Sequence, residues 1–321
     1  MIRIASEAMS IEFDKIHEID LHEDSAGMRY DQVIARELGL SRSALEPLFE
    51  QEVITHAKTG KLVRKSDRVT PGDKVFVKIP ARKEESEAVV DIPILYEDED
   101  IVVIDKPVGV AAHPSPGWTG PTVTGSLQAM GVQLSSQGAE EREGIVHRLD
   151  VGTSGVMVVA KSSIAHRALK SQFKDREVSK VYYALAQGHI DPAVGTIDAP
   201  IDRHPKEDHR FAVVASGKPS ITHYEAMEFF PAVTLLRIEL ETGRTHQIRV
   251  HFSAIKHPLV GDLTYGADPR LAKALSISRP WLHAMELEFS HPRSGERVRF
   301  HAPYPADLSE SLESLRSSIG G

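Results

Sequence analysis

The sequence contains no cysteine among its 321 residues. This absence excludes disulfide bonds, thiolate metal sites and a cysteine nucleophile, and it is typical of a cytosolic protein. No apolar run approaches the roughly 18 residues that a membrane-spanning helix needs. The first segment, Met1–Glu23, interrupts each short apolar stretch with acids, unlike a secretory signal peptide. We therefore expect a cytoplasmic protein with no membrane association.

Several signatures of catalytic and cofactor sites are also missing. There is no Gly-x-Ser-x-Gly segment, which argues against a serine hydrolase, and no glycine-rich phosphate-binding loop. The sequence has 16 histidines, but His246 and His251 are five residues apart, the wrong spacing for two metal ligands on one helical face. We expect no metal and no cofactor.

The acidic charge is concentrated in two segments of the chain. The formal net charge is −8, which at first sight argues against a nucleic-acid partner. Residues 1–27 carry 2 basic and 7 acidic side chains, residues 80–100 carry 2 and 8, and residues 101–321 carry 24 of each. Because the excess acid lies outside the largest part of the chain, that part can still present a basic groove to a polyanion.

Length and these shifts in composition predict two domains with acidic segments around them. We expect an acidic N-terminal extension over 1–27, a small α/β domain over 28–80, an acidic linker over 81–100, a catalytic domain over 101–308 and a C-terminal tail over 309–321.

The small domain has two stretches with apolar residues at helical spacing, followed by short apolar strands. Ser-Arg at the start of the second helix and Gly-Asp before the last strand resemble the small RNA-binding module named after ribosomal small-subunit protein four. This sequence has Glu50-Gln51-Glu52 where that module usually has a basic residue and a glycine. The alternative is a generic small α/β domain.

From residue 101 onward, short apolar strands alternate with turns. Strands are predicted at Ile101–Ile104, Val156–Ala160, Val181–Ala186, Thr222–Glu228 and Val233–Leu240, and a helix at Ile164–Phe173. Regular βαβ alternation is absent, so we predict an α+β domain with a mostly antiparallel, mixed sheet flanked by helices and loops.

A polar cluster precedes the most apolar of these strands. His147 and Arg148 stand three and two residues before Asp150, and a turn rich in Gly, Thr and Ser leads from Asp150 into the strand. A carboxylate at a strand entrance with neighbouring cations can act on a bound polyanion. The alternative is an aspartate that only caps a turn.

A second polar cluster, Glu241 to His251, contains two Arg, two His and a Gln that can contact phosphates, sugars and base edges. Within it, Arg249 could instead pair with a carboxylate from elsewhere in the chain. A strand with polar edge residues is the structural alternative for this cluster. A third feature is the pair Tyr182-Tyr183, whose side chains face opposite sides of a strand, so that at most one lines a site. The alternative is that the tyrosine is only a core residue.

The order of these motifs resembles the pseudouridine synthases of the RluA type. The strongly specific elements are His147-Arg148-Leu149-Asp150 and the segment Gly243 to Arg249. Supporting matches are Asp105-Lys106-Pro107, Lys180 to Ala184, Pro200 to Pro205, Gly217-Lys218, His257 to Asp262, Tyr265-Gly266 and Leu282-His283-Ala284. The resemblance covers roughly 101–305 and, more loosely, the small domain.

The resemblance implies isomerisation of specific uridines in RNA to pseudouridine. The enzyme would cleave the glycosidic bond, rotate the uracil and rejoin it through carbon 5, without a cofactor or metal. The family's catalytic aspartate corresponds to Asp150, and Tyr182 corresponds to the tyrosine that packs on the base and is implicated in removing the carbon 5 proton. Arg249 corresponds to the basic partner of the aspartate. Arg148 corresponds to the residue thought to occupy the space that the everted base leaves.

Four further residues are expected to bind the RNA substrate. They are His147, Arg244, His246 and Gln247. We expect ribosomal RNA of the large subunit as the target, with transfer RNA as the alternative, and a monomeric enzyme. Two other functions stay open: a non-catalytic RNA-binding protein, and a glycosidase-like hydrolase in which Asp262 would have to supply the second carboxylate.

Overall fold

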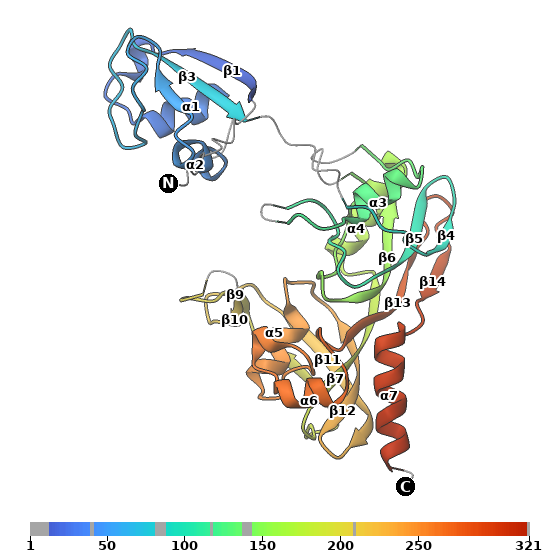
Figure 1. Cartoon of the computed structure of the whole chain (residues 1–321). Coiled ribbons are helices and arrows are strands. Elements are labelled where there is room, and N and C mark those ends of the chain that lie inside the picture. Colours follow the sequence, from blue (N-terminus) through green and yellow to red (C-terminus); the bar gives the residue numbers. More distant parts are fainter. Residues whose placement is uncertain are drawn as a thin grey trace, which may run out of the picture. The chain divides into compact units, whose positions relative to one another are not determined.

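The computed structural model of the chain describes residues 13–38, 42–80, 88–115, 118–136, 143–207 and 210–319. The chain divides into two compact units, Met1–Glu84 and Glu85–Gly321 (Figure 1). Each unit has a hydrophobic core of its own. The division agrees with a small domain followed by a larger one.

The small unit is a three-stranded antiparallel sheet packed against two helices (Figure 1). The strand order is β1-β3-β2. Its elements are β1 (Phe13–Asp20), the short 3-10 helix η1 (Glu23–Ser25), α1 (Tyr30–Leu38), α2 (Arg42–Glu50), β2 (Ile54–His56) and β3 (Lys74–Pro80).

Strand β1 lies in the segment predicted as an acidic extension over 1–27, and the structure corrects that boundary. β1 pairs with β3 along its length, and Ile19 and Leu21 are buried in the small core. The acids of β1 are accommodated because Lys74 of β3 lies 2.6 Å from Glu18 and 3.0 Å from Asp20. Acidic composition concealed a strand whose charged side chains face a lysine on the neighbouring strand.

The larger unit is built on a nine-stranded sheet with helices packed against it (Figure 1). Its strands are β4 (Ile94–Glu97), β5 (Ile101–Lys106), β6 (Ser154–Ala160), β7 (Ser179–Gln187), β8 (Val194–Asp198), β11 (Ile221–Phe230), β12 (Val233–Leu240), β13 (Leu282–Ser290) and β14 (Arg297–His301). A separate two-stranded sheet consists of β9 (Ile201–Arg203) and β10 (Phe211–Val213). The helices are α3 (Val123–Ala129), α4 (Ser163–Asp175), α5 (Gln247–Ala254), the 3-10 helix η3 (Leu263–Tyr265), α6 (Pro269–Ala274) and α7 (Ala306–Ile319).

The large sheet is mixed and mostly antiparallel, as predicted. Its strand order is β4-β5-β6-β13-β7-β12-β11-β8, with β14 paired to the side of β13. Among the pairs of this sheet, β13 runs parallel to β6, and the other paired strands are antiparallel. The α+β prediction and the predicted strand and helix cores are confirmed.

Gly155 fixes the close approach of β6 to β13. Its φ is +118°, and a Cβ atom at this position would lie 2.2 Å from the carbonyl oxygen of Ala284. Only glycine is compatible with both constraints. The contact therefore fixes the start of β6, the strand that directly follows the Asp150 loop.

The predicted C-terminal tail is instead most of helix α7. Leu308 and Leu312 are buried against Trp281, and the indole N–H of Trp281 donates to Ser311 Oγ at 2.7 Å. Apolar residues at i and i+4 carry the helical pattern that predicts this packing. The boundary at residue 308 cuts through one amphipathic helix.

The end of the predicted acidic linker also belongs to the larger unit. Ile92 is buried in its core, and β4 pairs with β5. Asp100 is buried and accepts hydrogen bonds from Ser162 and Arg293. Residues 81–87 of the predicted linker lie outside the described residues.

Candidate active site

Asp150 lies on the loop that leads into β6, and a buried side chain and backbone hydrogen bonds fix this loop. Leu149, the residue before Asp150, is buried in the main core. The backbone N–H of Thr153 donates to the carbonyl of Asp150 at 3.0 Å, and that of Gly109 donates to the carbonyl of Val151 at 2.8 Å. The Asp150 side chain remains 18% exposed, so it is fixed in position yet accessible.

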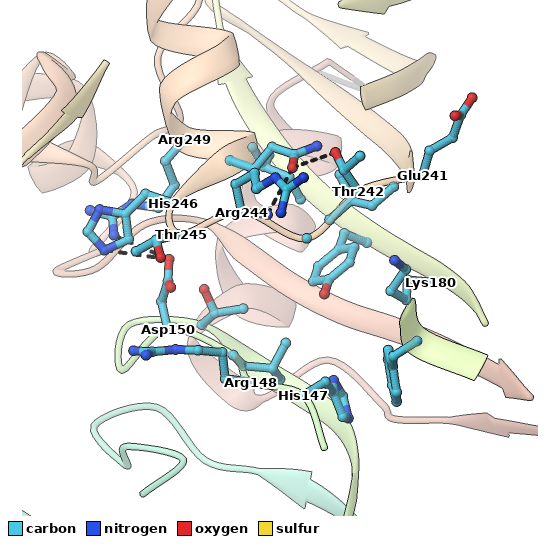
Figure 2. Close-up of a pocket in the computed structure, with 18 of the residues that line it drawn as sticks. His147, Arg148, Asp150, Lys180, Glu241, Thr242, Arg244, Thr245, His246 and Arg249 are labelled. Atoms are coloured by element: carbon cyan, nitrogen blue, oxygen red, sulfur yellow. Dashed lines mark hydrogen bonds and ion pairs between the residues drawn. The ribbon is translucent and has the colours of Figure 1, made fainter. Parts of the chain in front are cut away.

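Arg249 of helix α5 brings the second polar cluster to Asp150, 99 residues away in sequence. The strand alternative for this cluster is wrong, because α5 begins at Gln247. Nε and Nη2 of Arg249 donate to the two carboxylate oxygens of Asp262, at 2.7 and 2.9 Å. Nη1 lies 3.4 Å from Asp150 Oδ2. The predicted pairing of Asp150 with Arg249 is therefore present, and Figure 2 shows both side chains directed toward each other.

The environment of Arg249 keeps it charged. Burial alone would lower its pKa, but the hydrogen bonds to Asp262 and the charges of Asp262 and Asp150 raise the pKa above the ordinary arginine value. The guanidinium also lies 5.0 Å from the ring centroid of Tyr265, within cation–π distance. A positively charged group thus faces the Asp150 carboxylate at 3.4 Å.

His246 is the residue before α5 and is the second positive candidate near Asp150. Its Nε2 lies 3.9 Å from Asp150 Oδ2, and its Nδ1 is 2.8 Å from the hydroxyl of Tyr265. Its backbone is left-handed, with φ of 56°, a conformation that costs about 1 kcal/mol in a non-glycine residue. Burial lowers the pKa of the imidazole more strongly than Asp150 raises it. His246 is therefore placed beside Asp150 as a mainly neutral ring.

Tyr182 of β7 lines the same pocket, and Tyr183 does not. Tyr182 belongs to the main core, whereas Tyr183 packs against Tyr304 on the other side of the sheet, with ring centroids 6.1 Å apart. Burial, together with the negative charge of Asp150, raises the pKa of Tyr182 well above that of a free tyrosine. At neutral pH the Tyr182 phenol is therefore protonated.

Gln247 was predicted to bind substrate, and its contacts in the structure correct that prediction. The side chain is buried, and its amide oxygen accepts hydrogen bonds from Thr242 Oγ1 at 2.8 Å and from the backbone of Arg244 at 3.0 Å. Its amide nitrogen donates to Ile221 and Thr222 of β11 at 2.9 and 3.0 Å. Because both ends of the amide are engaged within the protein, Gln247 fastens the start of α5 to β11.

His147 also has internal partners instead of a free ring. Its Nε2 accepts the backbone N–H of Val158 at 3.0 Å, and the ring stacks on Phe173 with centroids 4.5 Å apart. Burial, helped by the charge of Lys180, lowers the pKa of His147 to about 3. At neutral pH His147 is therefore a neutral ring that lines the pocket, and its predicted contact to RNA stays a prediction.

A pocket of about 450 Å³ lies between the Asp150 loop, β7 and the start of α5 (Figure 2). The charged side chains that line it are mostly basic. They are Arg148, Lys174, Arg176, Lys180, Arg244 and Arg249, with Asp150 and Glu241 as the acids. Arg148 and Arg244 are exposed, as residues that meet an incoming polyanion should be. The excess acid in the sequence therefore does not extend to this pocket.

Sequence reasoning gave no site role to Lys174, Arg176 or Lys180, although Lys180 stands in one of the segments that resemble the family. One signal was readable for Lys180, because it stands two residues before Tyr182 on the same strand and therefore on the same face. Lys174 and Arg176 carried no such signal, since α4 ends between them and the turn determines where they point. The pocket wall that they form arises from the three-dimensional fold.

Arg279 supports the Asp150 loop from behind. Its buried guanidinium donates from Nη1 to Ser154 Oγ at 3.1 Å and to the carbonyl of Leu282 at 3.2 Å. Nε and Nη2 donate to Asp307 of α7 at 2.7 and 2.9 Å. Helix α7 is thus connected to the start of β6 through one arginine.

Within the described residues, no group of three His, Asp or Glu side chains is arranged to hold a metal ion. Among the helices in that part of the chain, none is both long and apolar enough to cross a membrane.

Comparisons with known proteins give one consistent family. A profile described as RNA pseudouridylate synthase matches residues 100–254. An uncharacterized RNA pseudouridine synthase of Mycobacterium bovis is 54% identical over 91% of this chain and 95% of its own length. A ribosomal large subunit pseudouridine synthase D of Escherichia coli O157:H7 is 42% identical over 92% of this chain and 93% of its own length.

The solved structures agree with the sequence matches. The human RNA pseudouridylate synthase domain containing 1 superposes with a TM-score of 0.56 at 29% identity, covering 72% of this chain and 95% of the human one. The matched range, residues 100–254, includes Asp150, Tyr182 and Arg249, which all line the pocket.

Proposed function

This chain belongs to the RNA pseudouridylate synthase family and isomerises uridine in RNA to pseudouridine, and from that premise we propose that its substrate is the RNA of the large ribosomal subunit. The Escherichia coli relative named for the large ribosomal subunit aligns with nearly the whole chain, including the small unit. Alignment over both units supports a shared way of recognising RNA. Transfer RNA is the alternative substrate.

One observation carries the assignment of the active site to these residues. Asp150 lies 3.4 Å from Arg249 at a pocket whose charged lining is mostly basic, in a chain of net charge −8. A carboxylate that is partly buried needs a fixed cation to stay ionised, and a pocket for an RNA strand needs positive charge for the phosphates. Both conditions are met by the same group of side chains.

In this proposal Asp150 acts at the ribose of the target uridine, and Arg249 keeps it charged and oriented. The resemblance to the RluA type leaves open whether Asp150 attacks the sugar covalently or first acts as a base. Arg148, exposed at the pocket beside Asp150, takes the place of the uridine after the base leaves its stack. His246, mainly neutral and 3.9 Å from Asp150, contacts the sugar or base.

Tyr182 is the residue that removes the proton from carbon 5 of the rotated uracil. Burial and the negative charge of Asp150 raise the pKa of Tyr182 and keep its phenol protonated. The phenol oxygen can therefore accept the carbon 5 proton only if its own proton leaves at the same time. That proton can pass to water or to the Asp150 carboxylate, which is free again once carbon 5 has bonded to the sugar.

We propose that the small unit binds RNA at a basic segment. Five exposed basic side chains lie within eleven residues there, namely Lys58, Lys61, Arg64, Lys65 and Arg68. They would bring an RNA region outside the target loop to the protein, by contacts to phosphates that carry no sequence information. The cytoplasmic location and the monomeric state stay predictions.

The hydrolase alternative requires a second carboxylate that can activate water. Asp262 is the candidate, but its side chain is 1% exposed and both oxygens accept hydrogen bonds from Arg249. This arrangement supports a structural role for Asp262. Released free uracil in a reaction with uridine-containing RNA would instead favour the hydrolase.

The experiment that tests the substrate is a map of pseudouridine in cellular RNA. Carbodiimide-dependent reverse-transcription stops are compared in cells with the gene, without it, and with Asp150→Asn in its place. We expect stops in large-subunit ribosomal RNA that vanish in the second and third strains. Stops that vanish only in transfer RNA would overturn the ribosomal proposal, and unchanged stops at every site would overturn the assignment of Asp150.

A further inference from the structure

Lys180 is a half-buried cation without a counter-charge. It lies on β7, two residues from Tyr182 and on the same face of the strand. Across the described residues, its Nζ has neither an ion pair nor a hydrogen bond to a protein group, although other lysines of the same unit do. Burial, together with the charge of Arg176, lowers the pKa of Lys180 to about 8. A buried cation next to a second cation is unfavourable unless an anion joins them.

Arg176 provides the second positive group of the pocket wall that Lys174, Arg176 and Lys180 form. It caps the C-terminal end of α4 in a left-handed conformation, with φ of 63°, where glycine is the usual residue. Among the described residues it pairs with Glu241 at 3.7 Å, and both side chains are more than two-fifths exposed. Such a loose surface pair leaves the guanidinium available to a stronger acceptor. Lys174, also exposed, lines the same wall.

This wall is separate from the group around Asp150. Figure 2 shows Lys180 and Glu241 at one side of the pocket and Asp150, His246 and Arg249 at the other. Arg249 is already neutralised by two carboxylates. On the side of the pocket away from Asp150, Lys174, Arg176 and Lys180 lack a full counter-charge and can bind an anionic ligand.

We propose that Lys180 and Arg176, assisted by Lys174, form a phosphate subsite that binds a backbone phosphate of the RNA flanking the target uridine. The proposal deepens the RNA-modifying function and rests on it. A phosphate offers several acceptor oxygens at one point, so an ammonium and a guanidinium can share it. The uridine itself enters near Asp150, and the strand is anchored on the opposite wall beyond Tyr182.

Salt dependence distinguishes a phosphate contact from a structural role. Each phosphate contact to single-stranded RNA adds about 0.7 to the slope of log association constant against log salt. Removing one contact should therefore weaken binding about fivefold at 0.1 M salt, and the difference should disappear near 1 M salt. A substitution that only damages the fold would weaken binding at every salt concentration.

The first test compares Lys180→Met and Arg176→Gln with Lys170→Met. Lys170 is an exposed lysine of α4, the helix that Arg176 caps, and it does not line the pocket. Binding of a uridine-containing RNA oligonucleotide is measured by fluorescence anisotropy over a range of KCl concentrations. We expect a shallower slope, by about 0.7, for the first two variants and the parent slope for the third. Equal slopes in all four proteins would overturn the subsite.

The second test locates the phosphate on the RNA. Single phosphates of the oligonucleotide are replaced one at a time by uncharged methylphosphonates, and parent and Lys180→Met are compared on each. At one position near the target uridine, replacement should weaken binding to the parent about fivefold and leave Lys180→Met unchanged. Equal losses in both proteins at every position would overturn the proposal.

These measurements are independent of which cellular RNA is modified. A failure of the ribosomal substrate would appear only in the map of cellular pseudouridine. A failure of the subsite would appear only in the slopes and in the methylphosphonate comparison.

Discussion

Arg249 donates to both oxygens of Asp262, at 2.7 and 2.9 Å, and presents only Nη1 to Asp150, at 3.4 Å. The shorter contacts belong to the carboxylate that is 1% exposed and the longer one to the carboxylate that faces the pocket. Asp262 therefore determines where the guanidinium lies, and Asp150 shares the remaining edge. The proposed catalytic pair depends on a third residue that need not touch the substrate.

Asp262→Asn tests this dependence. The amide cannot balance the buried charge of Arg249, so the free energy of unfolding should fall by about 3 kcal/mol, measured by urea denaturation. Activity should fall as well, because Arg249 loses the contacts that orient it toward Asp150. Asp268→Asn is the control, since Asp268 caps α6 at the surface and asparagine caps equally well. Parent stability and activity in Asp262→Asn would contradict the positioning role.

Tyr182→Phe should bind RNA like the parent and lose pseudouridine formation by at least about a hundredfold. The substitution removes one hydroxyl from the pocket and leaves the aromatic ring in the core. Tyr183→Phe is a matched control, because the same change one residue later affects the opposite side of the sheet. Single-turnover rates separate the two variants. Equal losses in both would indicate damage to β7 instead of a missing proton acceptor.

The elements that sequence predicts best here are those in which local pattern and tertiary environment agree. The apolar run of β6 is buried throughout, and its predicted extent of Val156–Ala160 falls within the strand. The alternation of facing directions separated Tyr182 from Tyr183. The pairing of Asp150 with Arg249 followed from the resemblance, because nothing local in either segment specifies a partner 99 residues away.

Polar side chains that could contact either a ligand or the protein itself were predicted less well. Gln247 and His147 both lie in polar motifs, and sequence alone cannot distinguish a ligand contact from an internal hydrogen bond. In the structure, the side-chain amide of Gln247 forms hydrogen bonds with Thr242 and Thr222. Nε2 of His147 accepts a hydrogen bond from the backbone N–H of Val158. Composition misled in a different way at β1, where acidic residues suggested an extension although Lys74 of β3 balances them.

RNA binding should weaken as the pH rises through about 8, because Lys180 loses its proton there. The charged groups beside it are Arg176, whose charge acts on Lys180, and Glu241, which lies at the same side of the pocket (Figure 2). The expected decrease is at most about fivefold at 0.1 M salt, the contribution of one phosphate contact. The stability of the free protein should change in the opposite direction. Between about pH 8 and pH 10 the unfolded state binds more protons at Lys180 than the folded state, so its contribution to stability rises with pH.

Lys180→Arg separates this effect from other titrations. Arginine stays charged at these pH values, so the variant should show no decrease in affinity near pH 8. Burial lowers the pKa of Lys106 to about 7, so Lys106 loses its proton in a similar pH range, but it is present in both proteins. Anisotropy titrations at fixed salt measure the effect. The same decrease in parent and Lys180→Arg would assign it to Lys106 or to another group.

Asp307→Asn tests whether helix α7 stabilises the active-site loop. Asp307 holds Arg279 by two hydrogen bonds, and Arg279 in turn holds Ser154 at the start of β6. We expect the free energy of unfolding to fall by about 2 kcal/mol, the usual contribution of hydrogen bonds to a charged group, and the single-turnover rate to fall with it.

Arg316→Gln is the matched control for this prediction, because Arg316 also connects α7 to the sheet. Its partner is Glu228 of β11, both side chains are more exposed than Arg279, and neither touches the Asp150 loop. Loss of this surface pair should cost at most about 1 kcal/mol and leave the rate unchanged. If Asp307→Asn lowers stability but keeps the parent rate, α7 stabilises the fold without positioning Asp150. If both variants reduce the rate equally, attachment of the helix as a whole is what matters, and the specific path through Arg279 and Ser154 is wrong.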